Sequence, residues 1–67
     1  MKESKEIFLR YFRDLYESEK AAYDLYSNFL VTSKDEVINK KIEKIKNDEE
    51  KHMEIAKKII TLIEESA

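Results

Sequence analysis

The stretch Thr32-Ser33-Lys34-Asp35-Glu36, near the middle of a chain of 67 residues, decides the fold. Ser33 and Glu36 have the spacing of a capping box, in which a serine and a glutamate satisfy the free N–H groups at the start of a helix. The stretch therefore predicts that one helix ends and another begins here, with a turn at about residues 32–34.

Apolar residues recur every three or four positions on both sides of this turn. The spacing predicts one helix over about residues 4–31, with Ser4 as its N-cap, and another over about 34–64. One continuous helix is the alternative, but the two apolar stripes are out of phase, so such a helix would change its buried face halfway along. The stripes are Phe8, Phe12, Leu15, Glu19, Ala22, Tyr26, Phe29 and Ser33, then Ile38, Ile42, Ile45, Glu49, His52, Ala56, Ile59 and Ile63.

A second stripe on the first helix, formed by Leu9, Tyr16, Tyr23 and Leu30, widens its apolar surface and predicts more than one neighbour. Residues 1–67 are accordingly interpreted as a single domain, an all-α antiparallel helical hairpin that dimerises into a four-helix bundle. A domain this small needs a metal, a staple or a partner for stability.

The composition excludes several classes of function. Cysteine is absent, which excludes disulfides and thiolate metal sites, and glycine is absent too, which disfavours phosphate-binding loops. The formal net charge is -2 and neither sign forms a block, so we expect no nucleic-acid partner and no membrane surface. With no transmembrane stretch or signal-peptide core evident, the cytoplasm is the expected compartment.

Three ionisable residues interrupt the apolar stripes. Glu19 lies in the first, and Glu49 and His52, three residues apart, lie in the second. On a helix this spacing places a carboxylate and an imidazole on the same side of successive turns, where they can hold one metal ion. In an antiparallel hairpin Glu19 approaches the same level within roughly 5 to 9 Å along the axis, and the lean of the side chains reduces the gap. The sequence therefore predicts a metal site formed by Glu19, Glu49 and His52.

Two hairpins related by a two-fold axis would contribute four glutamates and two histidines, the ligand inventory of a di-iron carboxylate bundle. Oxygen and imidazole donors suit iron, with manganese or zinc as alternatives. Asp48 is a candidate acceptor for the free ring N–H of a ligating histidine, including one on the partner chain. Tyr26 is a candidate donor of a hydrogen bond to a ligating carboxylate.

The combination of Glu19, Ala22 and Tyr26 with Asp48-Glu49-x-x-His52 resembles the ferritin-like superfamily, and is most similar to rubrerythrins and encapsulated ferritins. The resemblance implies ferroxidase activity for iron detoxification and storage, with two irons per dimer. It further implies that Glu19 and His52 are terminal ligands and Glu49 a bridging ligand at a catalytic centre shared between two chains. A homodimer or higher homo-oligomer and an encapsulating shell protein are the partners it implies, with localisation inside that protein compartment as the alternative to free cytoplasm.

A different class remains open alongside the enzyme. In this alternative the chain is a non-enzymatic dimeric interaction module, in which Glu19 and His52 form an ion pair that sets the dimer register and Glu49 lies at a wet edge.

Overall fold

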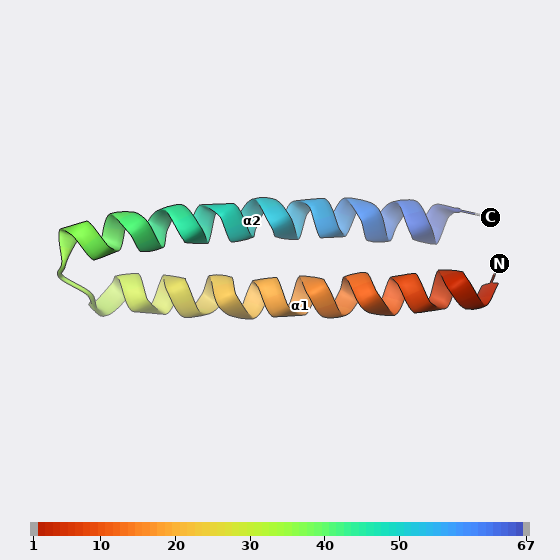
Figure 1. Cartoon of the computed structure of the whole chain (residues 1–67), viewed down its shortest axis with the longest axis horizontal. Helices are drawn as coiled ribbons and strands as arrows, with labels where there is room; N and C mark the ends of the chain where they lie inside the picture. The colour runs from red at the N-terminus through yellow and green to blue at the C-terminus, as the bar shows by residue number, and fades with distance from the viewer. Residues whose placement is uncertain (1, 67) are drawn as a thin grey trace.

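The structure, a computed structural model, describes residues 2–66. Two α-helices, α1 (Lys2–Thr32) and α2 (Glu36–Glu65), run antiparallel along each other's length, and the described residues contain no strand (Figure 1). The predicted all-α hairpin is thus confirmed. Because α1 is already helical at Lys2, Ser4 lies inside the helix and the prediction that it is the N-cap is wrong.

The hairpin is a narrow rod measuring 51 × 14 × 12 Å. The turn closes one end, and the start of α1 and the end of α2 meet at the other, which we call the free end (Figure 1). Neither helix contains an apolar stretch that would suffice to cross a membrane.

α2 is capped by Asp35, and the predicted capping box of Ser33 and Glu36 is wrong. The Asp35 Oδ1 accepts hydrogen bonds from the backbone N–H groups of Val37 at 3.0 Å and Ile38 at 3.1 Å. A carboxylate placed directly before the helix is favoured there because it also faces the positive end of the helix dipole. The helix consequently begins about two residues later than predicted.

Ser33 supports the turn in another way. Its hydroxyl accepts a hydrogen bond from the Asp35 backbone N–H at 3.4 Å, and its carbonyl accepts one from the Asn39 side-chain amide at 3.0 Å. Its own N–H donates to the Phe29 carbonyl at 3.0 Å, which continues the α1 ladder by one bond. The connection is therefore short and well supplied with hydrogen bonds, which restricts how the helices can slide along each other.

The surface between the helices, which we call the seam, consists of half-buried residues spaced alternately three and four apart. Ala56 alone is buried, at 2% exposure, among the residues whose burial the structure describes. A single hairpin therefore has almost no fully enclosed core. The seam comprises Leu9, Phe12, Tyr16, Glu19, Tyr23, Tyr26 and Leu30 of α1, and Asn39, Ile42, Lys46, Glu49, Met53, Ala56, Ile60 and Ile63 of α2.

Lys46 is the least expected member of the seam, and an aromatic ring accommodates it. Its Nζ lies 5.1 Å from the centroid of the Tyr23 ring, and Lys57 Nζ lies 5.6 Å from the Tyr16 ring in the same way. Cation–π contacts let the lysine stems cover apolar surface while the ammonium groups reach water.

The predicted apolar stripes coincide only in part with the seam. The second stripe of α1, headed by Leu9, turns toward α2, whereas Phe8, Leu15 and Phe29 of the first stripe are exposed. These exposed residues belong to a surface beside the seam that we call the open face. Its rows are Phe8, Tyr11, Leu15, Ser18, Ala22, Leu25 and Phe29 of α1, and Ile38, Lys41, Ile45, Asp48, His52, Ile55, Ile59 and Leu62 of α2.

The opposite side of the seam is polar. This charged flank consists of Glu6, Arg13 and Lys20 of α1 with Glu43, Glu50, Lys57 and Glu64 of α2. At the free end, Arg13 Nη2 lies 3.1 Å from Glu64 Oε2, and both side chains are at least half exposed.

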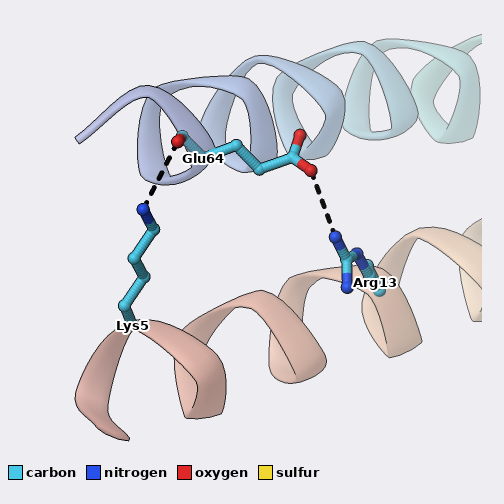
Figure 2. Close-up of polar contacts among 3 residues, drawn as sticks. All are labelled: Lys5, Arg13 and Glu64. Carbon is cyan, nitrogen blue, oxygen red and sulfur yellow. Dashed lines mark hydrogen bonds and ion pairs between the residues drawn. The ribbon is translucent and has the colours of Figure 1, made fainter. Parts of the chain in front are cut away.

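Lys5 reaches across the free end to the last turn of α2. Its Nζ donates to the backbone carbonyl of Glu64 at 3.3 Å (Figure 2). It also donates to the backbone carbonyl of Ser66 at 2.8 Å. Carbonyls at the end of a helix lack partners within the helix, and a cation is favoured at this negative end of the dipole. Lys5 therefore helps to terminate α2 while joining it to α1.

Candidate metal centre

Glu19, Glu49 and His52 come together as predicted. Each offers a ligand atom, and these atoms all lie within 4.8 Å of one another. His52 Nδ1 lies 3.2 Å from Glu19 Oε2 and 4.0 Å from Glu49 Oε1. The meeting of these three side chains is therefore confirmed, while their occupation by a metal ion stays a prediction.

Local helix geometry explains the arrangement. Glu49 and His52 project from successive turns of α2 because residues three apart on a helix are neighbours. Glu19 lies near the midpoint of α1, and the short turn places it at the same level. The group is thus held by two long helices and not by loops, which suits a site that needs fixed distances.

The three side chains differ in burial. Those of Glu19 and Glu49, both seam residues, are 12% and 22% exposed, whereas that of His52, on the open face, is 56% exposed. The two carboxylates are thereby partly withdrawn from water, and the imidazole lies between them and the open side. Within a single chain, the exposed imidazole makes the group accessible from the open face.

An open groove of about 330 Å³ adjoins the group on this side. Apart from the two ionisable side chains it contains only apolar residues, so an occupant of matching shape would remove water from the group. The lining residues are Phe12, Leu15, Glu19, His52, Ile55, Ala56 and Ile59.

The donor set fits a first-row divalent metal ion. Oxygen and nitrogen ligands bind such ions at about 2.0–2.2 Å, which places two ligands of one ion roughly 3 to 4.4 Å apart. The widest separation here, within 4.8 Å, needs only a small side-chain rotation to enter that range. Carboxylate and imidazole donors without thiolate are suited to iron, manganese or zinc.

One chain supplies only half of a dinuclear ligand set. A di-iron centre in a helical bundle uses a glutamate from each of two helices and Glu-x-x-His from each of the other two. In this hairpin the group takes one glutamate from α1 and one Glu-x-x-His from α2, and it borders a groove that is open to water. The site is therefore incomplete unless further donors approach across the open face.

Asp48 and Tyr26 do not join the group within the chain. Asp48 is exposed on the open face and Tyr26 is half-buried in the seam. No hydrogen bond among the described residues connects either of them to Glu19, Glu49 or His52. Their supporting roles at a metal-bound centre stay predictions, including that of Asp48 toward the partner's histidine.

Ile55 is a residue near the group that the sequence analysis missed. It lines the groove beside His52 and is 55% exposed. The available signal was its seven-residue spacing from Leu62, which marks a row outside both predicted stripes.

Comparison of the chain with protein-family models, curated proteins and solved structures found no match. Function must therefore be argued from the geometry of the group and the surface around it.

Proposed function

We propose that this chain is a ferroxidase-type di-iron protein whose centre forms between two copies. Each copy contributes Glu19, Glu49 and His52, and Fe(II) is the substrate. The convergence of these three ligand groups at mid-length, facing the open side of the hairpin, is the observation that carries the proposal. The resemblance to ferritin-like proteins supports the same choice.

The reaction balances with either of two oxidants. Two Fe(II) ions each lose one electron, and dioxygen accepts both electrons with two protons to give hydrogen peroxide. With peroxide as the oxidant, the two electrons and two protons give two molecules of water. Carboxylates that change their mode of coordination compensate the higher charge of Fe(III).

The ligand roles follow from the resemblance. Glu19 and His52 are proposed as terminal ligands and Glu49 as the bridge between two irons. Empty, four carboxylates in one bundle core repel one another, so bound cations would stabilise the assembly. A bundle of this size encloses no mineral, and storage therefore requires a higher assembly or a separate shell protein.

The test is an anaerobic Fe(II) titration of chelator-treated protein, followed by admission of dioxygen and measurement of the ferric absorbance. We expect one iron per chain and rapid oxidation. Glu49→Ala should lose stoichiometric binding with its helix content intact, since alanine strongly favours the helix. Glu50→Ala, which removes the neighbouring carboxylate on the charged flank, is the matched control and should bind normally. Stoichiometric binding by Glu49→Ala would contradict the assignment.

The interaction module is the second candidate, and one distance favours it. His52 Nδ1 lies 3.2 Å from Glu19 Oε2, which is an ion-pair distance for a protonated imidazole. In that case the polar group determines how two hairpins align and carries no reaction. The absence of saturable Fe(II) binding, together with a stable dimer, would select this candidate.

A further inference from the structure

The open-face row of α1 has nearly the same character when read from either end. Ser18 occupies its centre, and the residues on the two sides of Ser18 match in type. Tyr11 and Leu25, the second from each end, are 62% and 65% exposed, so the described residues leave this row largely uncovered. The matched pairs are Leu15 with Ala22, Tyr11 with Leu25, and Phe8 with Phe29.

The open-face row of α2 shows the same symmetry around the level of Glu50. Its central pair, Asp48 with His52, matches an acid with a base. Farther out, Lys41 is matched with Ile59. The pairs are Asp48 with His52, Ile45 with Ile55, Lys41 with Ile59, and Ile38 with Leu62.

These two centres lie at one level of the hairpin. Tyr23 lies against Lys46 across the seam. Ser18 lies five residues from Tyr23 in the direction of the free end. Lys51, which is adjacent to Glu50, lies five residues from Lys46 in the same direction. One axis perpendicular to the rod can therefore pass through both centres, at the level of Glu19 and His52.

From this coincidence we propose that a second copy of the chain docks antiparallel on the open face, α1 on α1 and α2 on α2, about a two-fold axis at the level of Ser18. The inference deepens the assembly on which the proposed function rests, and does not itself require iron. Under a perpendicular two-fold axis each residue meets its matched counterpart, so that apolar residues cover apolar residues. The face, about 51 by 14 Å, offers on the order of 700 Å² per copy, close to the roughly 800 Å² per partner of a stable interface.

Charge distinguishes this arrangement from a parallel one. In a parallel pair, with the two-fold axis along the rod, α1 would lie on the partner's α2, and the open-face row of α1 contains no basic residue to face Asp48. In the antiparallel pair Asp48 meets the partner's His52, and the aliphatic stem of Lys41 lies along the partner's Ile59. Because His52 directs Nδ1 toward Glu19 and Glu49, its Nε2 is left to donate to such a carboxylate. Asp48 is thereby a positioning residue for the partner's imidazole.

Single cysteines test the register, because the natural chain contains none. Ser18→Cys should form a covalent dimer under mild oxidation or with a short bis-maleimide. Tyr11→Cys should not, since two copies of residue 11 would lie about 21 Å apart along the axis. Mixing Tyr11→Cys with Leu25→Cys should restore cross-linking in the mixed dimer. Cross-linking of Tyr11→Cys to itself, or none for Ser18→Cys and the mixture, would overturn the proposal.

These outcomes separate the inference from the proposed function. Cross-linking as expected in chelator-treated protein that takes up no Fe(II) would retain the register and reject the ferroxidase. Uptake of one iron per chain, with a cross-linking pattern other than the expected one, would retain the ferroxidase and reject the antiparallel register. Ser18 and Tyr11 are exposed in the hairpin, so circular dichroism should show that both variants keep their helices.

Discussion

The open face and the charged flank border the same seam, yet they differ in almost every property. The charged flank carries acids and bases, with an ion pair between Arg13 and Glu64 that is largely exposed to water. The open face carries large apolar residues that the described residues leave exposed, and Glu19 and His52 line the groove on it. Exposed apolar patches of this kind are typical of surfaces that bind a partner. In the proposed dimer the open face is covered by the second copy, while the charged flank stays in contact with water.

A charge placed on the open face should give the largest effect. Phe29→Glu would bury an unpaired carboxylate in the proposed interface, which costs about 3 kcal/mol and weakens dimerisation roughly 100-fold. Asn28→Glu adds the same charge one residue away on the outer surface of α1, and should leave the dimer intact. Analytical ultracentrifugation over a range of concentrations measures both. Equal behaviour of the two variants would remove the distinction between the surfaces.

Metal removal should produce the next largest effect. Each Fe(II) ion, held anaerobically at about 100 times its Kd, stabilises the folded dimer by about 2.7 kcal/mol, which corresponds to a rise in Tm of roughly 10 °C per iron bound. Excess chelator should abolish this rise. Glu49→Ala should show the same Tm with and without chelator. Chelator-independent melting of the natural chain would favour the interaction module.

Asp48→Asn should have a smaller and more selective effect. If Asp48 orients the partner's His52, the amide should weaken metal affinity about 10-fold at unchanged stoichiometry, as expected for a group that acts through a ligand. Dimerisation without metal should change little, because the apolar rows remain. Asn47→Asp, which adds a carboxylate one position away and outside the open face, provides a control for local charge. Calorimetric titration with Fe(II) distinguishes the two variants.

Breaking the charged flank should have the smallest effect. Arg13→Ala removes the ion pair with Glu64, and exposed pairs of this kind contribute about 0.5 kcal/mol or less. Unfolding in urea should shift only slightly, with the cross-linking pattern and iron stoichiometry unchanged. Arg10→Ala serves as the comparison, because this exposed arginine lies beside Arg13 but forms no ion pair with the described residues. A loss of dimer in Arg13→Ala would show that the flank takes part in assembly.

The sequence was sufficient to predict the hairpin and the meeting of Glu19, Glu49 and His52. Phase and spacing carry these predictions, because a helix has a fixed rise and period and a short turn ties the levels of both helices together. Which of the two apolar stripes of α1 faces α2 was not predictable in the same way. Where two adjacent rows of a helix are both apolar, periodicity shows that both can be buried but not which neighbour each one meets.

The cap of α2 shows a similar ambiguity. Ser33 and Asp35 are both good N-cap residues, and they lie two positions apart in the sequence. The structure uses Asp35 as the cap, while the Ser33 hydroxyl accepts a bond from the Asp35 backbone N–H. The local sequence pattern located the turn between the helices. The first residue of α2 was decided by which of the two side chains accepts the hydrogen bonds from the start of the helix.

The short turn has a consequence for the order in which this hairpin forms and opens. A three-residue connection between α1 and α2 makes loop closure inexpensive there, so pairing of the helices should start at the turn and proceed along the seam. The level of Glu19 and His52 would then form midway, and the contacts of Lys5 with the last turn of α2 would form last. Amide hydrogen exchange of the natural chain should accordingly be fastest at the free end and slowest between the turn and the ligand group.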